Sequence, residues 1–185
     1  AWNLLSGKHE VNDYSEPEEV FGPCAGAALY RRSMLDEVGF FDEDFFAYLE
    51  DVDIAWRARS AGWSCLYVPT ATVYHAHSAT FGEGSQFKNF HLGRNRVWLL
   101  AKNYPFHNLW YYVPLIILYD FLAVIYAILI EGNGQALVGR LIGLSGWWKM
   151  RHKRANFQLG HSGDVSYLEG LEWPWLVLRR YRRTR

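Results

Sequence analysis

The sequence predicts an α/β domain over residues 1–106, followed by an apolar helical extension over residues 107–185. Two observations predict the domain. Short strand-like runs alternate with segments of helical periodicity, and half of all residues are hydrophobic, which argues against a disordered chain. A third observation predicts the extension, because the composition changes near Pro105 and becomes almost entirely apolar. At 185 residues, the chain is long enough to bury a hydrophobic core.

The N-terminal region predicts a loop, a buried strand and a short helix. Residues 1–22 are polar and indicate a loop, whereas the small and apolar run CAGAALYRR at 24–32 indicates a buried strand. Ser33 and the acidic residue three positions later have the spacing of a capping box, which places a helix over Met34–Val38. Gly39 follows where such a helix would end.

Three carboxylates, Glu50, Asp51 and Asp53, lie at the expected start of a second helix, which runs to Ala61 and ends at Gly62. Acidic residues in a first turn interact favourably with the helix dipole by about 0.3–1 kcal/mol each, so capping explains any one of them. It explains three beside the aromatic FFAYL run less well, because desolvation there raises carboxylate pKa values. A carboxylate in this position is also well placed to act as a general base, although composition alone favours capping.

Beyond this helix we expect two extended pieces, a loop and a longer helix. A strand over 64–68 ends before a proline, and another extended piece covers 72–75. The loop over 76–88 contains two glycines and is either a lid over a substrate or an ordinary surface loop. The following helix, near 89–104, ends before Pro105.

Charge is distributed unevenly along the chain. Residues 1–53 hold 13 acidic and 3 basic residues, whereas residues 54–185 hold 6 acidic and 16 basic residues. The basic part predicts anionic partners such as phosphates or lipid headgroups, and we do not expect nucleic acid as a partner. Cys24 and Cys65 lie far apart in apolar runs, which favours free core thiols in a reducing compartment over a disulfide.

Two histidines and two arginines are candidates for binding anions or metals. His75 and His77 lie two residues apart in VYHAH, so both point to the same side if this piece is extended. A single histidine near a strand end is usually a hydrogen-bonded structural residue, and the pair shifts the balance only slightly towards a metal site. Arg94 and Arg96 indicate a solvated basic face or a phosphate contact, and for Arg96 we keep the solvated face.

Residues 20–106, taken in order, resemble the second half of the catalytic domain of family 2 glycosyltransferases, in particular the bacterial rhamnosyltransferase-like members. The resemblance rests on several motifs in succession: a G-x-x-x-G-A run, the G-F-F-D-E-D-F-F turn, an acidic E-D helix start, R-A-R-x-A-G-W, Y-V-P, Y-H and a later R-N-R. No single motif is specific enough, but their combination in this order is.

The resemblance implies the C-terminal half of a nucleotide-diphospho-sugar transferase domain of the GT-A type. It implies that Asp51 is the catalytic base and that Glu50 orients it or contacts the acceptor. It also implies that Gly26 and Arg94 bind the substrate, with Arg94 at the diphosphate. His75 is then a ligand of a divalent cation, Mg²⁺ or Mn²⁺.

The same resemblance implies an inverting transfer of a sugar, with dTDP-rhamnose as the first guess, from a nucleotide-diphosphate donor to a lipid-linked or polysaccharide acceptor. The family's first half carries an Asp-x-Asp metal motif, and none precedes residue 22, so we expect this chain to be part of a longer enzyme. Two alternatives remain open: a non-catalytic membrane-docking fragment, and a metal-dependent hydrolase built around His75, His77 and Asp51.

The apolar run at 109–130 is 22 residues long, which is sufficient to span a bilayer, although Asp120 costs about 2.5–3.5 kcal/mol there. A single crossing would separate the catalytic part from the basic segment at 149–154, and both belong on the cytoplasmic side. An in-plane helix, a re-entrant hairpin or an even number of spans avoids this conflict. With an amphipathic piece at 135–150, we expect association with the cytoplasmic face of the cell membrane rather than a soluble extension packed on the domain.

Overall fold

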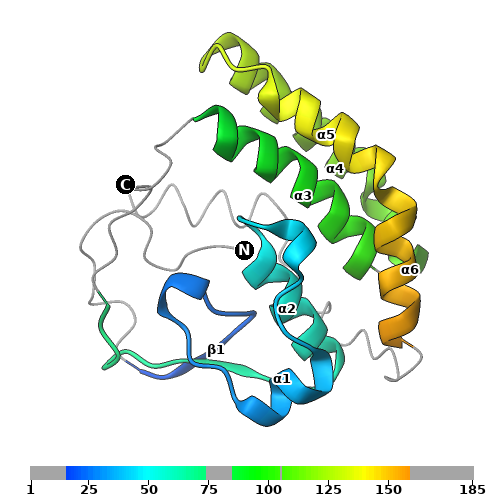
Figure 1. The fold of residues 1–185 in the computed structure, drawn as a ribbon. Coiled ribbons are helices and arrows are strands. Elements are labelled where there is room, and N and C mark those ends of the chain that lie inside the picture. The colour runs from blue at the N-terminus through cyan, green and yellow to red at the C-terminus, as the bar shows by residue number, and fades with distance from the viewer. Residues whose placement is uncertain (1–15, 74–84, 105, 159–185) are drawn as a thin grey trace.

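The computed structural model describes residues 16–73, 85–104 and 106–158. It contains a two-stranded sheet and a set of helices, in the order β1 (Glu18–Val20), the 3-10 turn η2 (Ala25–Ala27), α1 (Arg32–Val38), the 3-10 turn η3 (Glu43–Phe45), α2 (Glu50–Ser60), β2 (Cys65–Tyr67), α3 (Gln86–Asn103), α4 (Phe106–Leu129), α5 (Gln135–Ser145) and α6 (Trp147–Gln158). Figure 1 shows α3 and α5 side by side with α4 behind them, and α2 and α1 to one side of this group. The described part is therefore mostly helical.

Strand β2 of the small sheet lies within the strand predicted at 64–68, whereas β1 forms where the sequence predicted a loop. β1 pairs antiparallel with β2, with Glu19 opposite Leu66. Arg59 of α2 holds β1 in place, because its guanidinium contacts the Glu19 carboxylate and donates to the carbonyl oxygen of Val20 at 2.7 Å. The prediction of a loop was wrong for these residues because the strand depends on tertiary partners and not on its own polar sequence.

The strand predicted at 24–32 is absent. Ala25–Ala27 form the 3-10 turn η2, and the side chain of Leu29 is fully exposed. Small residues have little side-chain surface to pack on a sheet, and no strand pairs with this run within the described residues. Cys24 is consequently exposed and free rather than a core thiol.

Three of the predicted helices form, and two of them, α1 and α3, begin earlier than predicted. Helix α1 begins earlier than expected at Arg32, so Ser33 lies inside it and the predicted capping box is wrong. Helix α2 agrees with the prediction, and Gly62 follows it with φ of 85°, a conformation that side chains with a Cβ rarely adopt. Helix α3 begins before the predicted residue because Ser85 caps it, its hydroxyl accepting from the Lys88 N–H at 3.2 Å.

Helices α3 and α5 pack with their backbones in close contact. A Cβ atom added at Gly139 would lie 2.2 Å from the Phe90 carbonyl oxygen, and one added at Gly93 would lie 2.5 Å from that of Ala136. Only glycine permits this approach. The amphipathic piece predicted at 135–150 consists of two helices that meet at Gly146, and the first of them, α5, packs directly on α3.

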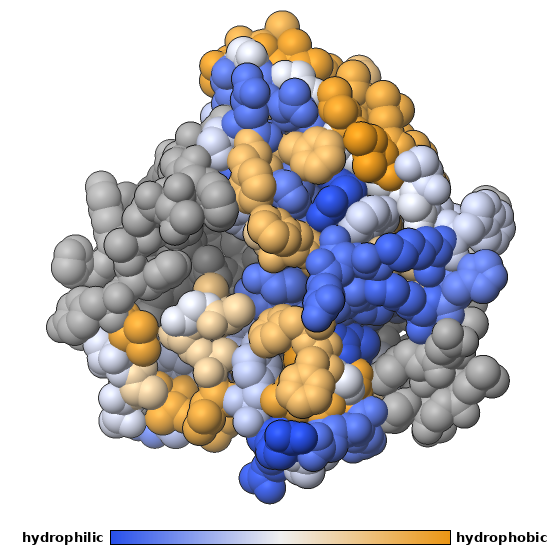
Figure 2. Space-filling view, viewed as in Figure 1, coloured by the Kyte–Doolittle hydropathy of each residue, from blue (hydrophilic) through white to orange (hydrophobic). Residues whose placement is uncertain are grey.

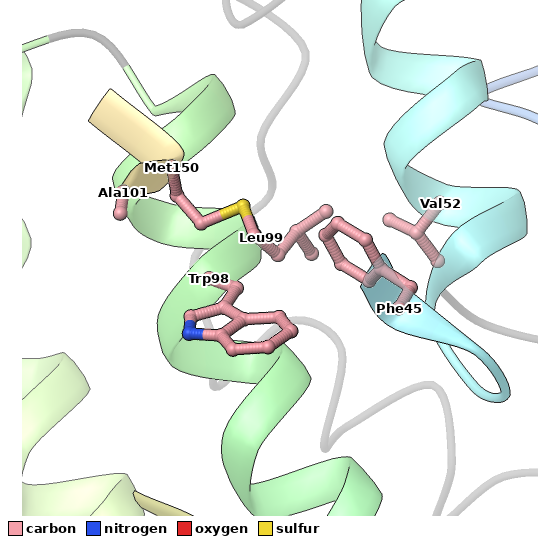
Figure 3. Close-up of a cluster of buried hydrophobic side chains, with 6 residues drawn as sticks. All are labelled: Phe45, Val52, Trp98, Leu99, Ala101 and Met150. Carbon is pink, nitrogen blue, oxygen red and sulfur yellow. The ribbon is translucent and has the colours of Figure 1, made fainter. Parts of the chain in front are cut away.

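The main hydrophobic core joins helices that are distant in the sequence. Figure 3 shows its buried side chains converging from η3, α2, α3 and α6: Phe45, Val52, Trp98, Leu99, Ala101 and Met150. Trp98 also donates from its indole N–H to the Gly143 carbonyl oxygen at 3.1 Å. The predicted boundary between residues 106 and 107 therefore falls between segments that share one core, and it remains a prediction.

Helix α4 is apolar and largely exposed. Its stretch Tyr112–Leu129 has a mean hydropathy of 2.2 and is only 6% buried, so by length and composition it is able to cross a membrane. Its single acidic residue, Asp120, pairs with Arg140 of α5 at 2.8 Å and with Arg96 of α3 at 3.3 Å. Arg96 therefore does not lie on a purely solvated face as expected, because the buried side of α4 supplies it with a counter-charge.

Candidate functional site

The N-terminus of α2 brings three of the predicted site residues together. The Asp51 carboxylate accepts a hydrogen bond from the Ala25 N–H at 3.2 Å and another from the Val52 N–H at 2.8 Å. Because Ala25 belongs to η2, the turn that contains Gly26 lies against the start of α2. These two amides fix the orientation of the carboxylate, and each of its oxygens keeps a lone pair for another proton donor.

Glu50 has different surroundings from its neighbour. Its Oε2 atom is buried and has no hydrogen-bond partner among the residues that the structure describes. Burial raises the pKa of Glu50, and the nearby charge of Asp51 raises it further. An unpartnered buried carboxyl oxygen is costly, so the group is suited to bind a hydroxyl group of a ligand.

Tyr30 is a third polar group beside this pair, and the sequence analysis did not identify it. Its hydroxyl is buried with no hydrogen-bond partner in the described part of the chain, and its ring packs edge-on against Phe41 at 5.6 Å between centroids. Burial and the charge of Asp51 raise the pKa of Tyr30 to about 12, so the hydroxyl keeps its proton. Within the LYRR run nothing in the local pattern indicates this role.

The loop that leads into α2 has an unusual backbone. Phe46, Tyr48 and Leu49 have φ values of 60°, 66° and 67°, although none of them is glycine. Each such residue costs on the order of 1–3 kcal/mol and persists only when the surrounding structure holds it. The strained residues end immediately before Glu50 and Asp51, so the loop determines where the acidic pair begins.

Helix α3 supplies the contacts that hold this loop. The buried Asn95 donates from its side-chain amide to the carbonyl oxygens of Phe45, Ala47 and Tyr48 at 2.9, 2.7 and 2.8 Å. Arg94 donates from Nη2 to the carbonyl oxygens of Asp44 and Phe45 at 3.1 and 3.0 Å.

Arg94, which the sequence predicted as a diphosphate contact, lies across the aromatic surface of α3. Its guanidinium carbon is 4.3 Å from the centroid of the Trp98 ring, and its Nε donates to Asn95 at 2.9 Å. Burial lowers the pKa of Arg94, and the charge of Asp44 opposes that effect. Among the described residues Nη1 has no partner, so this nitrogen remains available for an anion.

The acidic turn before the site is neutralised by lysines of α3 and α6. Asp42 contacts Lys102 at 2.7 Å and Lys153 at 2.5 Å, and Asp44 contacts Lys149 at 2.7 Å. Burial raises the pKa of Asp42, but the hydrogen bonds from the two lysines outweigh this effect and lower it to about 2. The basic segment at 149–154 was expected only to lie on the cytoplasmic side of the membrane. Two of its lysines also form ion pairs with the acidic N-terminal part of the chain.

Asp53, the third carboxylate of the acidic cluster, has a structural environment. It is fully buried and accepts hydrogen bonds from Arg57, Lys102 and Asn103 at 2.9, 2.9 and 2.8 Å. Every acceptor it offers faces a cation or an amide within the protein. Asp53 is therefore distinct from Asp51, whose carboxylate contacts the η2 turn, and from Glu50, whose Oε2 has no partner among the described residues.

The described residues do not form a cation site on their own. No group of three or more His, Cys, Asp or Glu side chains in the described ranges is arranged to hold a metal ion. Asp42 and Asp44 are satisfied by lysines. His75 and His77, the predicted metal-binding histidines, lie outside the described residues.

The start of α2 thus carries the oriented carboxylate of Asp51 next to Glu50, whose buried oxygen has no partner among the described residues. Residues 15–149 match the family model described as glycosyl transferase family group 2, and the chain belongs to this family. The resemblance found from the motifs is confirmed.

The chain is also similar to two curated proteins. It is 40% identical over 104 residues to the N-acetylglucosaminyl-diphospho-decaprenol L-rhamnosyltransferase of Mycobacterium tuberculosis, in strain CDC 1551 / Oshkosh and equally in strain ATCC 25618 / H37Rv. The match covers 54% of this chain and 32% of each relative, so the chain spans about a third of their length. No solved structure matches it significantly.

Proposed function

We propose that the full-length protein is an inverting glycosyltransferase in which Asp51 is the catalytic base. The observation that carries this proposal is the Asp51 carboxylate, fixed at the start of α2 by the Ala25 amide. Membership of glycosyl transferase family group 2 supports the reaction class, and also supports a GT-A domain whose C-terminal half is this chain.

An inverting transfer is a single in-line displacement at the anomeric carbon of the donor sugar. The acceptor hydroxyl forms the new bond as the nucleotide diphosphate leaves from the opposite face. Asp51 accepts the hydroxyl proton, and one carboxylate is sufficient because no covalent sugar-enzyme intermediate forms. Its two amide hydrogen bonds hold the carboxylate in position and leave lone pairs free for that proton.

The neighbouring groups supply binding and orientation. Glu50 contacts a hydroxyl group of the acceptor through its unpartnered oxygen, and Gly26 keeps the η2 turn free of a side chain beside the substrate. Arg94 contacts the diphosphate through Nη1, since Nη2 holds the loop before α2 and Nε donates to Asn95. We include a requirement for a divalent cation, Mg²⁺ or Mn²⁺, with His75 as one ligand, on the strength of the Y-H motif.

The substrates are proposed from the relatives. Their name specifies transfer of L-rhamnose to a decaprenol-linked diphospho-N-acetylglucosamine. We propose a nucleotide-activated rhamnose as donor and a lipid-linked diphosphate sugar as acceptor, which places the protein in the synthesis of a cell-surface polysaccharide.

The apolar helices support association with the cytoplasmic face of the cell membrane. The exposed side chains of α4 and α5 are mostly large and apolar, and Figure 2 shows apolar surface along α5 and the α4–α5 turn. The ion pair between Asp120 and Arg140 ties α4 to α5 and neutralises the charge that opposes burial in lipid. We propose that α4 and α5 lie in the membrane interface and do not cross the bilayer. Lys149 and Lys153 then stay beside Asp44, in the acidic turn before α2.

The test is a screen of the full-length protein with a panel of sugar nucleotides and a prenyl-diphosphate-linked N-acetylglucosamine, with products identified by mass spectrometry. The proposal predicts a glycosylated lipid with one donor and an absolute requirement for the acceptor. Release of free sugar at the same rate without an acceptor would indicate a hydrolase instead.

A further inference from the structure

Asn95 lies beneath the strained loop that precedes the acidic pair. Its side-chain amide is buried, and the proposed reaction does not use it. We propose that Asn95 is a positioning residue, which sets the direction of the Asp51 carboxylate by fixing the loop before α2. This inference rests on the proposed function, because it takes Asp51 as the base.

The geometry of the loop creates the need for this residue. Three of its residues have positive φ, and the carbonyl oxygens of Phe45, Ala47 and Tyr48 consequently converge on one point. Successive carbonyls of a helix or a strand do not converge in this way. Water is excluded, since Asn95 is completely buried, so the amide hydrogens of Asn95 are the donors that these oxygens share.

Both ends of the Asn95 side chain are used. While Nδ2 serves the loop, Oδ1 accepts a hydrogen bond from Arg94 Nε at 2.9 Å. A leucine of similar volume would leave the carbonyls of Ala47 and Tyr48 without this donor, although Arg94 would still donate to that of Phe45. An ionised aspartate would place negative charge against all three. An asparagine therefore satisfies the loop at one end and pairs at the other end with Arg94, which the carbonyls of Asp44 and Phe45 also hold independently of Asn95.

The loop is mechanically linked to Asp51. Leu49, the last residue with positive φ, is the N-cap of α2, and its carbonyl oxygen accepts from the Asp53 N–H at 3.0 Å. Asp51 lies in that same first turn, with its carboxylate bonded to Ala25 on the other side. A shift of the loop therefore moves the carboxylate relative to the η2 turn, and a misplacement of about 1 Å can cost on the order of 10²-fold in rate.

Asn103 offers a matched control on the same helix. It is also an amide that donates to α2, here to the Asp53 carboxylate at 2.8 Å, but it does not contact the loop. Asn103→Leu removes a hydrogen bond that stabilises α2 and leaves the contacts of Phe45–Tyr48 intact. Loss of stability and loss of positioning are thereby separated.

The experiment compares Asn95→Leu and Asn103→Leu in the full-length enzyme, with kcat and KM for the sugar nucleotide normalised to the folded fraction measured by thermal unfolding. We expect Asn95→Leu to lower kcat about 100-fold with KM changed less than about 3-fold. Asn103→Leu should lower the unfolding temperature but keep kcat per folded molecule within about 3-fold. Equal kcat losses in both variants, or an unchanged kcat in Asn95→Leu, would overturn the proposal.

Asn95→Ser keeps the experiment decisive if the leucine variant does not fold. Its hydroxyl can donate to one of the carbonyls, so we expect kcat about 10-fold below that of the native enzyme at an unchanged KM. A native kcat would overturn the proposal.

Asp51→Asn distinguishes a failure of the proposed base from a failure of the positioning role. Native turnover in that variant refutes the proposed base, whereas an inactive Asp51→Asn together with a fully active Asn95→Leu refutes only the positioning role.

Discussion

The ion pairs of Asp42 predict a specific dependence of stability on pH. Its pKa falls from 3.8 to about 2 in the folded protein, since Lys102 and Lys153 favour the ionised form more strongly than burial opposes it. A group whose folded pKa is depressed stabilises the protein above its unfolded pKa and loses that contribution as pH falls through its folded pKa. The lowering of the Asp42 pKa corresponds to a contribution of about 2.5 kcal/mol to the free energy of unfolding at pH 6. Screening by solvent reduces this contribution to about 1–2 kcal/mol.

The perturbation that tests this value is Asp42→Asn in the full-length protein, with thermal unfolding followed by the fluorescence of its tryptophans. At pH 6 we expect an unfolding temperature lower by about 3–6 °C, given about 2–4 °C per kcal/mol for a protein of this size. At pH 3 the native protein has lost about half of the stability that Asp42 contributes. The difference in unfolding temperature between Asp42→Asn and the native protein should therefore shrink by about half.

The control for this prediction is Asp36→Asn. Asp36 pairs with Arg32 on the surface of α1, where both side chains are more than half exposed, and exposed pairs contribute little. Its unfolding temperature should change by less than about 1 °C. A difference for Asp42→Asn that is the same at pH 3 and pH 6, or absent at pH 6, would refute the reasoning.

The remaining predictions concern the membrane and the cation. Replacing the exposed Leu118 and Phe121 of α4 with serine should move most of the protein from the membrane pellet to the soluble fraction. Serine at the exposed Phe40, which lies outside α4 and α5, should not. Equal recoveries of these variants in the soluble fraction would count against helices in the membrane interface. Removing divalent cations with a chelator should abolish transfer, and His75→Ala should raise the Mg²⁺ concentration needed to restore it; an unchanged requirement would remove His75 as a ligand.

The parts of the fold set by local sequence could be predicted. Helix α2 and its end at Gly62 follow from neighbouring residues, since a glycine with positive φ terminates a helix within one turn. Strand β1 could not be predicted, because Arg59 and β2 stabilise it from outside the strand. The strand expected at 24–32 failed for the same reason: an apolar run does not form a strand without a partner.

The candidate site shows the same division. The motifs singled out Glu50, Asp51 and Gly26 separately, and the structure places the Asp51 carboxylate against the η2 turn that contains Gly26. Asn95 appeared only as the middle letter of the R-N-R motif and Tyr30 gave no signal, because their importance depends on contacts and burial that only the folded chain reveals. The partners of Asn95 are main-chain oxygens 47 to 50 residues away, and no side-chain pattern records them.

The most direct test of the central claim is the rate of a single turnover by Asp51→Asn in the full-length enzyme, measured together with the dissociation constant of the sugar nucleotide. Asparagine keeps the shape of the side chain but cannot accept the proton of the acceptor hydroxyl. The account predicts a rate at least about 10²-fold lower with donor affinity almost unchanged. A variant that transfers sugar at the native rate would contradict it.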